Sequence, residues 1–318
     1  MSASTALHLV PRHSLIPMDK LLGPWMLGMV ISSIIFGITC LQVYLYYTKF
    51  ASKDSTFLKA FVAFLFSVEI LHLTMLTMSY YVASVTNFGD FVAIALGPWS
   101  LRAQIVIGVF LGTLVQLFYA FRIWTLSHKS PYLPVIIILC SFGALAFSIV
   151  YTIRASITQK FDNNSEVIPF STSALALEVA CDIFITLGMV FSLLNQRTDY
   201  QRTNRVLNIL IAYTVNSGAL TMIFAVCTLV LFLASKSTLL YSFFFFILVR
   251  LYGCSFMSIL NSREYVRSQL KVPRAEMVTM PIHSSRTDTA VTESKAATNM
   301  SGIVFGPNPG HETQFSAV

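Results

Sequence analysis

The sequence predicts an all-α polytopic membrane protein, a bundle of seven transmembrane helices. The first observation is a row of seven apolar stretches, each long enough to cross a hydrocarbon core of about 30 Å, which takes roughly 20 residues. The second is composition, because 55% of the residues are hydrophobic, only 11% are charged and the mean hydropathy is +0.71. A soluble domain carries about 25% charged residues. The sequence therefore indicates that lipid, not water, surrounds most of this chain.

Each apolar stretch predicts one transmembrane helix, bounded by the polar residues that flank it. In chain order the stretches are Leu22–Tyr47, Ala60–Ala83, Gly97–Phe121, Leu133–Tyr151, Ser173–Asn195, Leu207–Ala234 and Leu239–Leu260. Phe and Tyr are frequent, with 26 and 13 copies. This is typical of rings that face lipid or anchor at the headgroups.

The remaining parts of the chain are polar. We expect residues 1–21 to be a short extracellular N-terminus, 22–260 the seven-helix transmembrane domain, 261–274 a juxtamembrane basic segment and 275–318 a disordered cytoplasmic tail. The basic segment fits either an interfacial helix or an ordinary positively charged flank. Because the first twenty residues lack an apolar core and a cleavage site, the first helix is expected to serve as an uncleaved insertion signal.

Lysine and arginine are distributed unevenly between the two sets of connections. Twelve follow the first, third, fifth and seventh stretches, among them Arg122, Arg202 and Arg263, and six lie on the other side. The positive-inside rule therefore predicts an N-terminus outside and a C-terminus in the cytoplasm, and we expect the membrane to be the plasma membrane. Asn163 begins an Asn-x-Ser sequon in a connection that this topology places outside, so it is the glycosylation candidate.

Ionisable side chains occur inside the predicted helices, where each costs about 2.5–3.5 kcal/mol and usually faces a partner within the bundle. Glu69, Asp182 and Arg250 lie near the middle of the second, fifth and seventh stretches. His72 shares a helical face with Glu69, and Glu178 shares one with Asp182. We expect Arg250 to pair with Asp182 or Glu69, because an unpaired buried arginine is costly.

The candidate intramembrane polar site consists of Glu69, His72, Glu178, Asp182, Asn216 and Arg250. Asn216 opens a run of small and hydrogen-bonding residues of the kind that let transmembrane helices approach closely. One interpretation of the site is a polar cavity that binds a ligand or passes a proton. The other is a set of interhelical contacts that fix the order of the helices.

The motifs of the common hydrolases are missing, since neither H-E-x-x-H nor G-x-S-x-G occurs. His72 is the only histidine within an apolar stretch, so no metal site is expected at membrane depth. All five cysteines lie inside the stretches, which excludes an extracellular disulfide framework. The last stretch has no lysine for a retinal Schiff base, and the basic residues form no patch for nucleic acid. We therefore expect neither an enzyme nor a bound cofactor.

Several motifs are similar to those of a known family. They are Leu22-Gly23-Pro24, Gln42-x-Tyr44-x-Tyr46-Tyr47, Glu69-x-x-His72, Gln116-x-Phe118-Tyr119-Ala120-x-Arg122-Ile123-Trp124, Asp182-x-x-Ile185, Arg202-Thr203, Asn216-x-Gly218-x-x-Thr221 and Leu260-Asn261-x-Arg263. In this order they resemble the seven-transmembrane proteins of mushroom-forming (basidiomycete) fungi that are known only as a domain of unknown function. The resemblance implies the fold and a membrane location, and it supplies no activity.

Three functions agree with these observations. The leading hypothesis is a receptor-like or sensory protein that binds an unknown small molecule and reports it to a cytoplasmic partner through its inner loops and tail. The sequence lacks an Asp-Arg-Tyr motif after the third helix and has Phe121-Arg122-Ile123 at that place. We therefore do not expect the protein to couple to G proteins. The alternatives are a transporter or lipid-exporting carrier with a polar path at mid-membrane, and a membrane scaffold.

Overall fold

The computed structural model describes residues 18–52, 54–90, 93–94, 97–127, 130–158, 167–197, 201–234 and 239–271. All of them belong to one compact unit, which ends at Val272. Residues 1–17 of the expected N-terminal segment and the whole of the expected tail, 275–318, lie outside the described residues. Within the described ranges, the secondary structure is entirely helical.

The structure contains the seven predicted helices, and most are longer than the apolar stretches. They are α1 (Met18–Lys49), α2 (Thr56–Tyr81), α4 (Trp99–Leu126), α5 (Tyr132–Thr158), α6 (Ile168–Asn195), α7 (Gln201–Ala234) and α8 (Leu240–Lys271), with a one-turn π-helix, η2 (Val82–Thr86), directly after α2. Because α8 continues to Lys271, most of the basic segment predicted at 261–274 extends the last transmembrane helix. The prediction of an all-helical fold with seven long apolar helices is thereby confirmed.

Local sequence sets where two of these helices begin. Ser55 precedes α2, and its side chain accepts a hydrogen bond from the amide of Leu58, which satisfies one of the free donors of the first turn. Gly97 has φ of +66°, a conformation that a residue without a Cβ adopts readily, and Pro98 follows it at the start of α4. These residues turn the chain back into the bundle.

All seven helices are long and apolar enough to cross a bilayer. Large apolar side chains cover the outside, as at Leu41, Leu139 and Leu187, each more than 60% exposed. A soluble protein rarely exposes so much apolar surface. The protein is therefore an integral membrane protein that contacts lipid.

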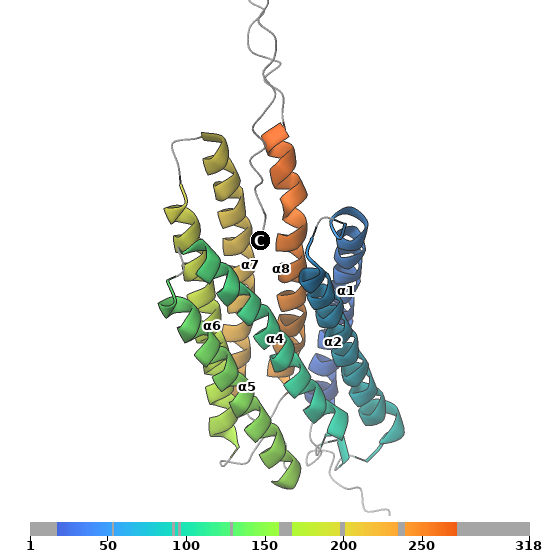
Figure 1. Ribbon diagram of the computed structural model, residues 1–318. Coiled ribbons are helices and arrows are strands. Elements are labelled where there is room, and N and C mark those ends of the chain that lie inside the picture. The colour runs from blue at the N-terminus through green and yellow to red at the C-terminus, as the bar shows by residue number, and fades with distance from the viewer. Residues whose placement is uncertain are drawn as a thin grey trace, which may run out of the picture. The chain divides into compact units, whose positions relative to one another are not determined.

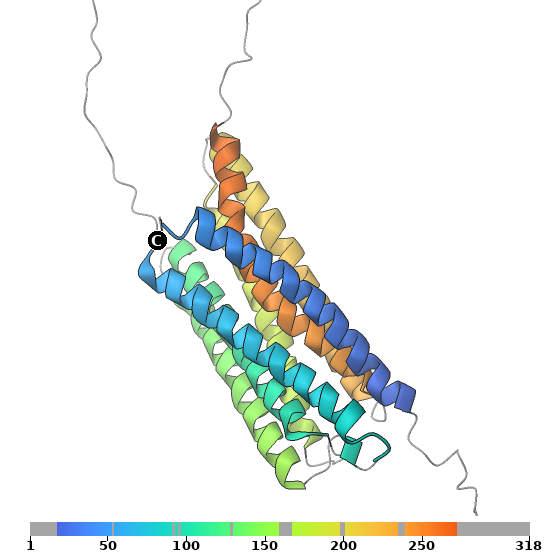
Figure 2. The same ribbon diagram turned by 90° about the vertical axis from the view of Figure 1, so that its right-hand side faces the viewer.

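Consecutive helices run antiparallel (Figures 1 and 2). We call the end where α1, α4, α6 and α8 begin the lower end, as Figure 1 draws it, and the end where α2, α5 and α7 begin the upper end. The C-terminal helix α8 packs against α1, α2, α4 and α7. In its apolar span 67% of the residues are buried, against 22% in α1 and α7, so α8 is the core of the bundle.

Two glycines one turn apart bring α4 close to its neighbours. A Cβ on Gly108 would lie 2.9 Å from a methyl of Val249 and 3.2 Å from Nε2 of His72. A Cβ on Gly112 would lie 3.3 Å from the ring of Tyr252. Small residues at this spacing allow membrane helices to pack tightly without a hydrophobic driving force. They fix the face that α4 turns toward α2 and α8.

Candidate functional site

The buried polar side chains form two separate clusters. The arginine cluster joins α1, α2, α4 and α8 and consists of Ser32, Glu69, His72, Gln104 and Arg250. The aspartate cluster joins α4, α6, α7 and α8 and consists of Gln116, Glu178, Asp182, Thr221 and Tyr252. The predicted site residues are thus brought together in two places.

Arg250 is completely buried and donates hydrogen bonds in three directions. Its Nε donates to Oγ of Ser32 at 3.1 Å, its Nη1 to the backbone carbonyl of Glu69 at 3.0 Å, and its Nη2 to Nδ1 of His72 at 2.7 Å. The guanidinium also lies 5.4 Å from the ring centre of Phe36. The rigid fork of an arginine suits such a junction, and here it ties α8 to α1 and α2.

The carboxylate of Glu69 is the counter-ion of Arg250. Its Oε2 lies 4.0 Å from Nη1, and both side chains are fully buried. Neither carboxylate oxygen has a hydrogen bond partner among the described residues. The carboxylate lies against Gly253 of α8, where a Cβ would collide with Oε1. Of the two partners predicted for Arg250, Glu69 is therefore confirmed, whereas Asp182 belongs to the other cluster.

The proton position on His72 follows from its partner. Arginine has no acceptor and stays protonated, so Nδ1 of His72 accepts and the ring carries its proton on Nε2. The amide of Gln104 lies beside this ring, although Nε2 of His72 and Oε1 of Gln104 lack a hydrogen bond of good geometry. Nε2 of His72 is thus a donor and Oε1 of Gln104 an acceptor, and neither has another partner among the described residues. Their neighbouring positions extend the arginine cluster to α4.

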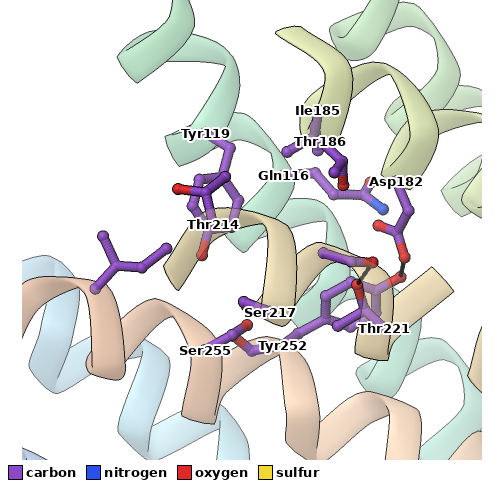
Figure 3. A pocket seen from close by; sticks show the side chains of 12 residues that line it. Gln116, Tyr119, Asp182, Ile185, Thr186, Thr214, Ser217, Thr221, Tyr252 and Ser255 are labelled. Carbon is purple, nitrogen blue, oxygen red and sulfur yellow. Dashed lines mark hydrogen bonds between the residues drawn. The ribbon is translucent and has the colours of Figure 1, made fainter. Parts of the chain in front are cut away.

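Asp182 lies on α6 at the centre of the second cluster. Its Oδ2 accepts a hydrogen bond of 3.0 Å from the hydroxyl of Tyr252 on α8 (Figure 3). Gln116 and Thr221 lie beside the same carboxylate. Thr221 donates to the carbonyl of Gly218 at 3.1 Å within its own helix. A single hydrogen bond of good geometry therefore joins α6 to the central helix here.

A small cavity adjoins Asp182 and extends toward the upper end of the bundle. We call it the upper cavity; its volume is about 30 Å³. Its lining residues come from α4, α6, α7 and α8 and are Gln116, Tyr119, Asp182, Ile185, Thr186, Thr214, Ser217, Gly218, Thr221, Tyr252, Ser255 and Ile259. Nε2 of Gln116, the hydroxyl of Tyr119 and Oγ1 of Thr186 have no hydrogen bond partner among the described residues. Such a space holds one or two water molecules.

Glu178 lies one turn below Asp182 on α6 and faces a second cavity. This lower cavity has a volume of about 50 Å³ and is lined mainly by apolar side chains, with Ser148 and Tyr151 of α5 and Tyr241 of α8 among its polar members. Oε2 of Glu178 is buried and has no hydrogen bond partner in the part of the chain that the structure describes. A carboxylate oxygen free to accept a hydrogen bond therefore ends the lower cavity.

The other predicted site residues lie away from these clusters. Asn216 is exposed on α7, and its neighbours Ser217 and Gly218 line the upper cavity instead. Arg122 is half-buried near the end of α4. Arg202 and Arg263 fall in α7 and α8 near the same upper end, but their side chains lie outside the described residues, as does Asn163.

Tyr252 is a residue of the candidate site that the sequence analysis missed. A tyrosine near the middle of a transmembrane helix is unusual, because these residues concentrate at the membrane interfaces. The signal for Tyr252 in the sequence is its position two residues after Arg250 in the same apolar stretch. Which helix Tyr252 contacts depends on the rotation of α8 about its own axis. A sequence pattern alone does not give that rotation.

Chemically, the clusters offer carboxyl, hydroxyl and guanidinium groups and no metal site. Within the described ranges, no three His, Cys, Asp or Glu side chains gather where they could hold a metal ion. Glu178 and Asp182 are able to accept hydrogen bonds or exchange protons with molecules in the two cavities. The fold and site together define an integral, all-helical membrane protein with a polar interior.

The comparison with protein families gives one similarity. Residues 178–265 match a family of unknown function, DUF6534. The matched region includes Glu178, all of α7, and Arg250 and Tyr252 on α8. It therefore contains most of the aspartate cluster. No curated protein and no solved structure matches the chain.

Proposed function

We propose that this protein is a receptor-like or sensory membrane protein in which α6 and α7 move relative to α1, α2 and α8. The observation that carries the proposal is the unequal way in which the two sides of α8 are held. On one side Arg250 makes three buried hydrogen bonds and an ion pair with α1 and α2. On the other side the Tyr252–Asp182 hydrogen bond stands beside a cavity with unpartnered polar atoms.

This asymmetry supports a two-state element. Three buried hydrogen bonds to a charged group hold a structure strongly, whereas one hydrogen bond beside a cavity leaves a region easier to rearrange. Movement of α6 and α7 alters the upper end, where the basic residues lie that we expect to face the cytoplasm. A ligand that binds one arrangement more tightly than the other shifts the population toward it, and this shift changes the upper end.

Distance measurements across the upper end test the proposal. Spin labels attached through p-azidophenylalanine at Phe57 and Asn195, both exposed, leave the native cysteines in place. We expect two distance populations in nanodiscs. Tyr252→Phe removes one hydrogen bond worth about 1 kcal/mol, which changes their ratio about fivefold.

The matched control is Tyr213→Phe, because Tyr213 lies 39% exposed on α7. It should leave the populations unchanged. A single distance, the same in the unmodified protein and in Tyr252→Phe, would contradict the proposed movement.

A carrier is the second candidate, and the cavities that reach Glu178 and Asp182 from opposite halves of the bundle favour it. With volumes of about 30 and 50 Å³ these cavities fit water molecules, so a lipid or other large solute requires a wider arrangement. Flux into proteoliposomes that Asp182→Asn blocks would support a carrier. A scaffold predicts that such substitutions lower folded yield alone. We also propose that the protein lies in the plasma membrane, that it has a cytoplasmic partner and that it comes from a fungus.

A further inference from the structure

The acidic pair on α6 lies between two cavities that occupy different halves of the bundle. The lower cavity begins near the lower end, where Ser171 and Tyr241 are within the first turn of their helices, and it ends at Glu178. The upper cavity begins at Asp182 and reaches Ile259, one turn before the apolar span of α8 ends at Ser262. One helical turn of α6, from Glu178 to Asp182, therefore separates the two.

Tyr252 closes this gap from the side of α8. Its hydroxyl donates to Oδ2 of Asp182 at 3.0 Å. Its ring lies over Gly112, 3.3 Å from the position of a Cβ there, and Oε1 of Glu178 lies 3.8 Å from the same position. The absence of a side chain at Gly112 thus leaves room for Oε1 of Glu178 and the ring of Tyr252 beside the same point on α4, while the Tyr252 hydroxyl reaches Asp182.

The groups around the acidic pair are hydroxyls, amides and thiols. Tyr119 and Gln116 face it from α4, Ser148 and Tyr151 from α5, and Tyr252 and Tyr241 from α8. From α7 come hydroxyls, including Thr221 and Thr228, and Cys181 adjoins Asp182 on α6. Neither cavity has a lysine, arginine or histidine among its lining residues, and Arg250 belongs to the other cluster.

Among the residues that the structure describes, the pair therefore has no cation in either cavity to balance two negative charges. Like charges one turn apart in a medium of low dielectric constant repel each other strongly, so the pair favours holding a proton. Within the described ranges, polar atoms without a hydrogen bond of good geometry line both cavities, namely Oγ of Ser148 and Oε2 of Glu178 below, and Oγ1 of Thr186 above. Water molecules in spaces of this size would satisfy them.

We propose that the protein conducts protons between the two ends of the bundle, with Glu178, Tyr252 and Asp182 as the relay between the two cavities. At rest the proton that the pair holds lies on Asp182. A hydronium ion in the lower cavity gives its proton to Oε2 of Glu178 and becomes water, and Asp182 gives its proton to water in the upper cavity. The carboxylic acid of Glu178 then passes a proton to the hydroxyl oxygen of Tyr252 as that hydroxyl gives its own proton to the carboxylate of Asp182, so the pair again holds one proton on Asp182.

Proton flux into vesicles tests this relay. The full-length protein is reconstituted into vesicles that contain the pH-sensitive dye pyranine, and a potassium gradient with valinomycin drives proton entry. We expect entry well above that of protein-free vesicles. Asp182→Asn and Glu178→Gln should each reduce it more than tenfold, because neither amide takes up a proton. Asp182→Glu, which keeps a carboxyl, should retain flux, and Tyr252→Phe should reduce it.

Two controls separate the relay from general damage. Asp90→Asn makes the same chemical change in a loop, where Oδ1 of Asp90 accepts from the amide of Ala93, and should keep full flux. Dicyclohexylcarbodiimide, which reacts with protonated carboxyl groups in apolar surroundings, should block the unmodified protein and label Glu178 or Asp182 in mass spectrometry. This second measurement holds even where a variant does not fold.

Three results would overturn the proposal. The first is proton entry no faster than in protein-free vesicles. The second is unchanged flux in both folded amide variants. The third is full flux after treatment with the carbodiimide, or block with labelling at neither residue.

Discussion

Arg250 shows how one residue organises a membrane interior. Its three donor groups point to a serine on α1, a backbone carbonyl on α2 and a histidine on α2. A lysine has no planar fork and cannot make this set of contacts. The residue therefore acts through geometry as well as through charge.

We predict that Arg250→Ala lowers the free energy of unfolding by about 3–5 kcal/mol, because it leaves Glu69 buried without its counter-ion. Arg250→Lys should recover only part of this loss. Unfolding in mixed micelles with increasing denaturing detergent measures both. The matched control is Arg205→Ala, an exposed arginine near the start of α7, which should cost little. Equal effects at both positions would contradict the assigned role of Arg250.

Gly253 is a second residue with a specific requirement. We predict that Gly253→Ala costs about 1–3 kcal/mol, because the new methyl group collides with Oε1 of Glu69. The cost should shrink when Glu69→Ala is already present, which a double-mutant cycle of unfolding free energies reveals. Gly37→Ala, where nothing lies within 4 Å of the added carbon, should be neutral or stabilising. Additive effects of Gly253→Ala and Glu69→Ala would argue against this contact.

At this scale the sequence identified the buried acids, the histidine and the arginine but only some of their partners. The depth of Glu69 and Arg250 follows from position within an apolar stretch, and their pairing was one of two predicted. The choice between Glu69 and Asp182 depends on which face of α8 each residue occupies after packing. Asn216 shows the opposite error, since it occupies an exposed face of α7 while Ser217 beside it lines the upper cavity.

Helix α4 depends on its two small residues for its place beside α8. We predict that Gly108→Ala lowers the midpoint of thermal unfolding by several degrees, because the added carbon would lie 2.9 Å from Val249 and 3.2 Å from His72. Val249→Ala should restore part of the loss by removing the opposing methyl groups. Intrinsic fluorescence during heating measures the midpoint.

Gly23→Ala in α1, with nothing within 4 Å, is the control for that change. A midpoint equally low after Gly23→Ala would mean that helix propensity, and not the approach of α4, sets the effect.

The ends of the helices differ from the apolar stretches for a physical reason. Hydropathy marks the depth of the bilayer, whereas a helix ends where its hydrogen bonds end. Residues 261–271 are polar yet contain Glu, Gln, Leu, Lys and Arg, which favour helix, so α8 extends past the apolar span to Lys271. The predicted start at Leu22 was likewise late, because α1 begins at Met18.

For the whole molecule, the seven apolar helices predict permanent membrane attachment. We expect the full-length protein to remain with membranes after an alkaline carbonate wash and to dissolve only in detergent. Recovery in the carbonate supernatant would contradict an integral location. A soluble cytoplasmic protein expressed beside it is the control.

The orientation rests on the distribution of basic residues and makes its own prediction. A C-terminal reporter should be accessible from the cytoplasm and an N-terminal one from outside. Asn299 also begins an Asn-x-Ser sequon, but it lies in the expected cytoplasmic tail. Asn163→Gln should therefore abolish any shift in mobility caused by a glycosidase, and Asn299→Gln should not. Both reporters in one compartment would refute an odd number of crossings.

The number of helices and their membrane location were predictable, because the hydropathy of each helix depends only on its own residues. The packing of α8 as the core was not. It depends on close approaches at Gly112 and Gly253 and on contacts with α1, which lies more than 200 residues earlier in the sequence.

That central position has a consequence for biosynthesis. The helix that completes the bundle is the last to leave the ribosome, so α1 and α2 enter the bilayer with Ser32, Glu69 and His72 still lacking their partner from α8. During that interval these side chains are what quality-control factors in the membrane would recognise. A polypeptide cut short before Leu240 should be destroyed rapidly, whereas supplying α8 as a separate fragment should prolong its lifetime.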